Sequence, residues 1–160
     1  MDEKVLEVVQ RVHELFRKKG LTLSVAESCT GGLISHYITT LPGASIFFKA
    51  GVISYSIESK KIILGVSHKI ISRYGVISEE TAREMAEKIR ALTRTDYSLS
   101  TTGNLGPDVL EDKERGIIFI AVSKKGQTLS RELRLTGDRG DNKMNASLSA
   151  LRFLIEVAEG

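Results

Sequence analysis

The segment best suited to chemistry is LTLSVAESCTGG, residues 21–32, in which a serine and a cysteine follow an alternating apolar run. The alternation predicts a strand, and Gly31-Gly32 opens an amphipathic stretch that reaches Leu41. Ser28 and Cys29 therefore lie in a tight turn between a strand and a helix, where free helix amides can face an anionic atom. This arrangement predicts nucleophilic catalysis, with either side chain as the attacking group.

A serine that attacks an amide also needs hydrogen-bond donors for the developing oxyanion. The backbone amides of Cys29, Thr30, Gly31 and Gly32 follow the serine directly and are the candidates for this oxyanion hole. The ordinary alternative is that Ser28 only caps the helix, because serine is favoured at that position for capping alone.

The nucleophile needs a base, and the sequence offers no suitable histidine. His13, His36 and His68 are the only histidines, and all three fall within predicted helices away from the strand ends, which favours surface or packing roles. Lys60 is the better candidate, because a partly desolvated lysine in the first turn of a helix can have its pKa lowered toward neutrality. Its alternative is a solvated helix lysine, as expected for its neighbour Lys61.

Tyr55 precedes Lys60 by five residues, at the exit of a predicted strand. Its hydroxyl can orient or relay a proton between Ser28 and Lys60. The alternative is an ordinary aromatic strand residue.

Two further segments have the composition of ligand-binding loops. Residues 103–115, GNLGPDVLEDKER, are polar, marked by glycine and proline, and too long for a simple connection. Backbone amides in residues 103–107 can cradle a phosphate, and Arg139 can grip one through two donors. Taken alone, a glycine-rich segment such as residues 103–107 is more often a turn. Asp138 and Arg139 are more often a surface ion pair.

The elements that must position these residues follow from apolar periodicity and breaker residues. A helix that begins after Ser78 carries inward apolar residues at helical spacing as far as Leu92. Residues 136–142 are predicted to form a loop. The other helices are predicted at residues 3–19, 31–41, 57–64, 67–74 and 143–158, and strands at residues 21–25, 49–56, 96–102, 116–123 and 128–135, the last two joined by a turn at 124–127.

This order predicts an α/β fold: a single three-layer α/β/α domain over residues 1–160, with a mixed, mostly parallel sheet and a late antiparallel hairpin. Open α/β sheets bind ligands where their strands end. The first three strands exit at Ser28, Tyr55 and Thr102, so we expect these residues to meet at one end of the sheet.

Composition narrows the function classes. A single cysteine cannot form an internal disulfide, and neither a membrane-length apolar stretch nor a signal-peptide core is present, so we expect a cytoplasmic protein without membrane contact. The net charge is +3, but the basic residues are interspersed with acids, which argues against nucleic-acid binding and gives a slight preference for a phosphorylated small molecule. The spacing of His, Cys and acidic residues predicts no metal site.

Five segments, taken together and in order, resemble the CinA C-terminal domain family. They cover nearly the whole chain: AESCTGG at residues 26–32, GVISYS at 51–56 followed by Glu58 and Lys60, VISEETAREMA at 76–86, TTGNLGP at 101–107 and GDR at 137–139.

The resemblance implies a stand-alone domain similar to nicotinamide-nucleotide amidohydrolases, which convert nicotinamide mononucleotide to nicotinic acid mononucleotide and ammonia. In that family the serine of AESCTGG is the nucleophile, a lysine five residues after the tyrosine is the base, and the tyrosine assists. These roles fall on Ser28, Lys60 and Tyr55. We further expect residues 29–32, Thr102, Gly103 and Arg139 to bind a small nucleotide substrate, no cofactor to be needed, and the chain to form a homo-oligomer.

The chain also departs from the family pattern. Ile57 replaces an asparagine, Lys143 stands where a second arginine often follows GDR, and Val109 and Leu110 replace a second glycine pair. Because glycines let a backbone approach a ligand closely, their loss predicts a changed or closed substrate pocket, with the catalytic residues kept. The alternative functions are a non-catalytic nucleotide-binding member of the family and a protein-interaction module.

Overall fold

The strands form one five-stranded sheet in the computed structural model, which describes all residues from 1 to 160. They are β1 (Leu23–Glu27), β2 (Phe48–Ile53), β3 (Tyr97–Gly103), β4 (Ile117–Lys124) and β5 (Gln127–Arg134), in the spatial order β2-β1-β3-β4-β5. β1 pairs in parallel with β2 and β3, whereas β4 is antiparallel to both β3 and β5. The predicted mixed sheet with a late hairpin is confirmed.

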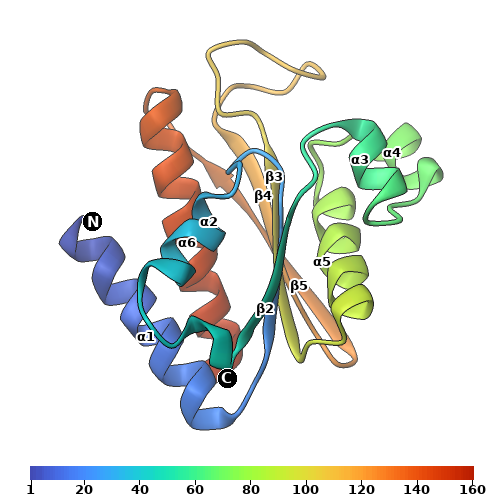
Figure 1. The fold of residues 1–160 in the computed structure, drawn as a ribbon. Helices are drawn as coiled ribbons and strands as arrows, with labels where there is room; N and C mark the ends of the chain where they lie inside the picture. The colour runs from blue at the N-terminus through green and yellow to red at the C-terminus, as the bar shows by residue number, and fades with distance from the viewer.

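Helices cover both faces of this sheet. They are α1 (Glu3–Lys19), α2 (Leu33–Thr40), the short 3-10 helix η1 (Ala44–Ile46), α3 (Ile57–Ile62), α4 (His68–Tyr74), α5 (Glu79–Thr93) and α6 (Arg139–Glu159). Figure 1 shows α1, α2 and α6 on one face and α3, α4 and α5 on the other, which confirms the three-layer arrangement. No helix combines the length and the apolar character needed to cross a membrane.

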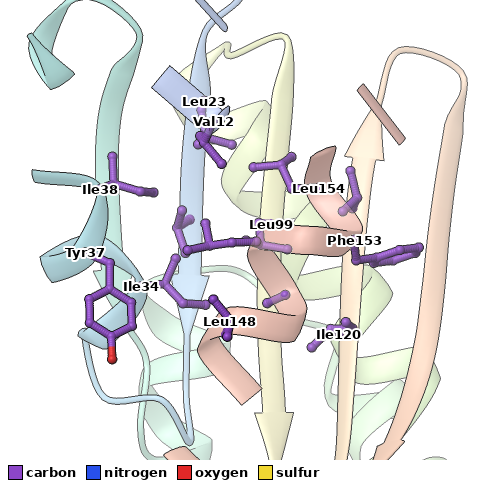
Figure 2. Close-up of a cluster of buried hydrophobic side chains, with 14 of the residues drawn as sticks. Val12, Leu23, Ile34, Tyr37, Ile38, Leu99, Ile120, Leu148, Phe153 and Leu154 are labelled. Carbon is purple, nitrogen blue, oxygen red and sulfur yellow. The ribbon is translucent and has the colours of Figure 1, made fainter. Parts of the chain in front are cut away.

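The main core lies between the sheet and the layer formed by α1, α2 and α6. Figure 2 shows Leu23 and Leu99 from neighbouring parallel strands among side chains of the helices, including Ile34 and Leu154. All five residues of β1 are buried, because both faces of a parallel strand are covered by helices. This burial anchors the strand that ends at Ser28.

The other face of β3 is lined by serines rather than large apolar residues. The hydroxyl groups of Ser98 and Ser100 donate to the carbonyls of Ala86 and Ala82 in α5, each at 2.5 Å. These bonds satisfy hydroxyl groups that would otherwise be costly to bury, and the small residues let the helix approach the sheet closely.

The last helix begins earlier than the apolar spacing predicts. Asp138 caps it, its carboxylate accepting a bond from the Asp141 amide at 2.8 Å, so α6 starts at Arg139 instead of Lys143. The predicted loop over residues 136–142 is therefore wrong in its second half. Residues 139–142 are polar and carry no periodic signal, and the cap decides where the helix begins.

The exposure of Leu92 and the end of β2 also differ from the prediction. Leu92 is 62% exposed, because it lies in the last turn of α5, beyond Ile89, the last buried residue of that helix. β2 ends at Ile53, so Tyr55 lies after the strand, and Ser56 caps α3 through a reciprocal pair of bonds with Ser59. The chain therefore turns sharply between β2 and the helix that carries Lys60.

Candidate active site

Ser28 lies in the turn between β1 and α2, at the end of the sheet. Its amide donates to the Thr101 carbonyl at 3.1 Å, which continues the pairing of β1 with β3 by one residue. The chain then turns through Gly31 and Gly32, with φ values of 58° and 99° that glycine adopts without strain. The serine side chain is thus held by the edge of a rigid sheet.

Lys60 extends from α3 to Ser28, and α3 lies on the face of the sheet opposite to α2. Its Nζ lies 2.8 Å from Ser28 Oγ and also donates to the carbonyls of Ser54, at 2.8 Å, and Tyr55, at 3.3 Å. The residue is only 2% exposed. The turn between β2 and α3 therefore provides two carbonyls that aim the amine at the serine oxygen.

Burial changes the acid–base chemistry of Lys60. Desolvation lowers the pKa of its ammonium from 10.5 to about 8, and the negative charge of Glu111 opposes this shift only in part. A lysine with this pKa has a neutral fraction near physiological pH and can then accept a proton from the hydroxyl to which it is bonded.

Glu27 is one of the residues of this site that the sequence interpretation missed. Its carboxylate is fully buried and accepts bonds from the Thr30 hydroxyl at 2.6 Å, the Ile34 amide at 3.0 Å, and both the amide and the hydroxyl of Ser35, at 3.0 and 2.8 Å. A carboxylate at the start of α2 satisfies amides that would otherwise lack partners. The only sequence signal for this bracing role is the position of Glu27 directly before Ser28, the predicted nucleophile.

The amides that follow Ser28 are not equivalent. The Gly31 amide donates to the Ser28 carbonyl at 3.0 Å, whereas the amides of Cys29, Thr30 and Gly32 have no protein acceptor. The Thr30 hydroxyl is bonded to Glu27 and to Thr101, so this side chain braces the turn. Free donors thus remain at the helix start, as an oxyanion hole requires.

A cavity of about 120 Å³ opens beside the serine and the lysine. It brings together seven of the residues singled out from the sequence, whereas Thr30, Gly31 and Gly32 do not line it. The cavity is lined by Ser28, Cys29, Tyr55, Lys60, Val76, Ile77, Thr102, Gly103, Asn104, Leu105, Leu110 and Arg139.

The sequence profile of the family described as "CinA C-terminal domain" matches residues 5–158, almost the whole chain. The chain belongs to the CinA C-terminal domain family. Among curated relatives, a "Putative competence-damage inducible protein" of Thermoanaerobacter pseudethanolicus is 43% identical over 162 residues, and one of Caldanaerobacter subterraneus subsp. tengcongensis is 39% identical over 160 residues. These alignments cover 98% and 99% of the chain but only 39% and 38% of the relatives.

Solved structures of CinA proteins share the whole fold. The competence/damage inducible protein CihA from Agrobacterium tumefaciens superposes with a TM-score of 0.95 at 29% identity, covering 100% of this chain and 98% of the other. A competence or damage-inducible protein from Enterobacter asburiae gives a TM-score of 0.94 at 30% identity, covering 98% and 99%. The fold class expected from the sequence is therefore that of solved CinA structures.

Tyr55 and Arg139 form a pair at the mouth of the CinA cavity. The Tyr55 side chain is 60% exposed, and its hydroxyl accepts a bond from Arg139 Nη2 at 3.0 Å. Arg139 Nη1 also donates to the Gly106 carbonyl at 2.6 Å. The tyrosine contacts Lys60 through its backbone carbonyl, and its side chain is bonded to the arginine instead.

Thr102 and Gly103 form the β3 wall of the cavity. The Thr102 hydroxyl donates to the Val76 carbonyl at 2.7 Å and ties β3 to the segment before α5. A Cβ at Gly103 would lie 2.6 Å from the Ile118 side chain, so this glycine allows close packing against β4. Their main contribution in the CinA domain is thus the shape of the wall.

Cys29 lies beside the serine, but its thiol is a weak nucleophile. Burial raises the pKa of its thiol from 9.0 to about 12. Because the thiolate is the nucleophilic form of cysteine, this environment disfavours Cys29 as the attacking group.

Two buried asparagines organise the loops around the site. Asn104 accepts a bond from the Gly106 amide at 3.0 Å, and Asn142 donates to the Leu105 carbonyl at 3.0 Å while accepting from the Gly137 amide at 3.0 Å. Neither was singled out from the sequence, because an asparagine in a polar segment gives no local sign of burial.

Proposed function

We propose that this CinA domain is a Ser/Lys amidase that hydrolyses the carboxamide of nicotinamide mononucleotide, or a related phosphorylated amide, to the acid and ammonia. The observation that carries the proposal is the 2.8 Å contact between Ser28 Oγ and the Nζ of a lysine that is 2% exposed. A structural lysine would be expected to pair with an acid or reach solvent, whereas this one is aimed at a hydroxyl by two carbonyls.

In the proposed mechanism, neutral Lys60 takes the proton of Ser28 as the serine oxygen attacks the carboxamide carbon. The tetrahedral intermediate collapses when Lys60 passes that proton to the nitrogen, the C–N bond breaks and ammonia leaves. A water molecule, deprotonated by Lys60, then attacks the acyl-enzyme, and its proton returns to Ser28 as the acid departs. Among the free amides after Ser28, that of Cys29 belongs to a residue that lines the cavity, so it is the candidate to hold the oxyanion in both steps.

Cations near the cavity favour an anionic substituent on the substrate. Arg139 and Lys143 are four residues apart in α6 and share one face of that helix. Arg139 lines the cavity, and a Cβ at Gly31 would lie 3.3 Å from Lys143 Nζ, so this ammonium lies over the start of α2. A phosphate at this position would meet two positive side chains and the positive end of a helix dipole.

The test is ammonia and acid release from nicotinamide mononucleotide by the parent protein, by Lys60→Ala and by Lys61→Ala. Lys61 is adjacent, has the same charge and makes no side-chain bond, so it is a matched control. We expect Lys60→Ala to lose turnover and Lys61→Ala to keep it. Equal background rates in all three proteins would overturn the amidase proposal for this substrate.

The second candidate, nucleotide binding without turnover, is favoured by the cations Arg139 and Lys143, because they could hold a phosphate whether or not the amide is cleaved. Thermal stabilisation of the parent protein by nicotinamide mononucleotide, with no ammonia released, would select this candidate.

A further inference from the structure

The cavity beside Ser28 is closed on one side by the loop that connects β3 to β4. Figure 1 shows this loop projecting beyond the end of the sheet and leaning toward α3 and α4. Leu105 and Leu110 of the loop line the cavity together with Val76 and Ile77. A volume of about 120 Å³ corresponds to roughly four water molecules. A cavity of this volume encloses a group on the scale of a single ring with its carboxamide, and a whole mononucleotide would extend beyond it.

Glu111 fastens this loop to the other wall. Its carboxylate accepts bonds from the amides of Val76 and Ile77, at 2.9 Å each. A Cβ at Gly75 would lie 2.8 Å from Glu111 Oε1, so the segment before α5 accommodates the carboxylate closely. We call these two bonds the Glu111 latch.

The latch places Leu110 against the site. Leu110 is the residue before Glu111 and lines the cavity, although it is still 52% exposed. A second bond, from the Lys113 amide to the Leu110 carbonyl at 2.9 Å, closes the tip of the loop. The rest of the loop is braced independently of the latch, by the bond of Arg139 to the Gly106 carbonyl at 2.6 Å.

We propose that Leu110, held in place by the Glu111 latch, limits the size of the amide that reaches Ser28, so that amides larger than a single ring enter only when the latch opens. This inference rests on the proposed amidase function for its substrate, but the latch itself is testable without turnover. Charge-assisted bonds to two backbone amides favour the closed loop, and breaking one of them shifts the balance toward the open loop.

Cys29 provides a direct readout of the latch, because it is the only cysteine and lines the cavity. The experiment compares its modification at pH 9 by methyl methanethiosulfonate and by a bulky aromatic methanethiosulfonate. The proteins are the parent, Glu111→Gln and Asp112→Asn. Asp112 is the adjacent loop residue, undergoes the same change of charge and makes no side-chain bond, so it is the matched control.

In Glu111→Gln we expect the bulky reagent to react about tenfold faster than in the parent, because one charge-assisted bond of the latch is lost. Asp112→Asn should match the parent. The modification rate with the small reagent should increase less than the rate with the bulky one. Equal bulky-reagent rates in all three proteins would overturn the latch.

The size limit itself is tested with Leu110→Ala, which trims the wall and leaves both latch bonds in place. Val109→Ala is the control, because Val109 is 61% exposed and does not line the cavity. We expect Leu110→Ala to raise kcat/KM for nicotinamide mononucleotide relative to nicotinamide by about tenfold, the scale on which one hydrophobic contact discriminates substrates, and Val109→Ala to leave the ratio unchanged. An unchanged ratio in Leu110→Ala would overturn the size limit. If no protein hydrolyses either amide, the proposed function fails, and the Cys29 rates still decide the latch.

Discussion

Arg139 and Tyr55, 84 positions apart in the chain, are joined by a hydrogen bond of 3.0 Å at the mouth of the candidate site. The bond directs the tyrosine hydroxyl toward the loop that Arg139 also holds through the Gly106 carbonyl. Tyr55 and Arg139 therefore form one structural unit, and this relationship leads to the first prediction.

If Tyr55 acts through Arg139, Tyr55→Phe and Arg139→Ala will not be additive. Each single variant should raise KM for nicotinamide mononucleotide several-fold. The KM of the double variant should equal that of the more impaired single variant, because the second change removes a partner already lost. Tyr74→Phe, at a tyrosine outside the cavity, should have no effect. Effects that multiply in kcat would instead favour an independent proton relay from Tyr55 to Lys60.

The second prediction concerns the pH dependence of activity and of stability. Activity requires neutral Lys60, whose pKa is lowered to about 8, so kcat/KM should rise with pH and level off above about 8. Because the unfolded lysine keeps a pKa near 10.5, the unfolded chain binds more protons between pH 8 and 10.5, and the free energy of unfolding rises with pH across that window.

This rise amounts to roughly 3 kcal/mol for Lys60, at 1.36 kcal/mol for each unit of pKa. Urea unfolding at pH 7.5 and pH 10 measures most of this rise. Lys60→Met should lack this part of the increase, whereas Lys61→Met should keep it. The same pH dependence in all three proteins would show that Lys60 has an ordinary pKa.

The third prediction separates the two adjacent nucleophile candidates. Ser28→Ala should reduce amide hydrolysis by at least about a thousandfold, as expected when a covalent nucleophile is removed. Cys29→Ala should change it only a few-fold, because burial raises the pKa of the Cys29 thiol to about 12 and keeps it neutral. Ammonia release measures both. A strong loss of ammonia release in Cys29→Ala, with Ser28→Ala still active, would identify Cys29 as the nucleophile instead of Ser28.

The fourth prediction concerns Glu27. In Glu27→Gln one oxygen becomes an amide nitrogen that faces donors, so at least one bond becomes a repulsive contact, and the free energy of unfolding should fall by roughly 2 to 3 kcal/mol. Urea unfolding measures this loss, with Glu7→Gln on the exposed face of α1 as the control. If Glu27→Gln is as stable as the control, the carboxylate does not brace the turn.

Much of the site could be predicted because its signals are local. The turn that carries Ser28 follows from an alternating strand, two glycines and a helix start, and the place of Lys60 follows from a short helix after a predicted strand. The late hairpin was also predictable, because Lys125-Gly126 separates two strand-like runs. The prediction was wrong at the ends of some helices and strands, such as the start of α6. There a single capping bond determines where the helix begins, and the sequence has no apolar periodicity.

The chain's local order was thus sufficient to predict the nucleophile turn, the α/β layers and the strand ends that converge at one edge of the sheet. Only the folded structure shows that Lys60 is desolvated and 2.8 Å from Ser28, that Glu27 is buried with its bonds satisfied, and that the Glu111 latch closes the loop. These bonds join residues 7, 32 and 35 positions apart. Burial and hydrogen-bond partners at such separations depend on which strands become neighbours and which helices cover them, and short-range periodicity does not encode either.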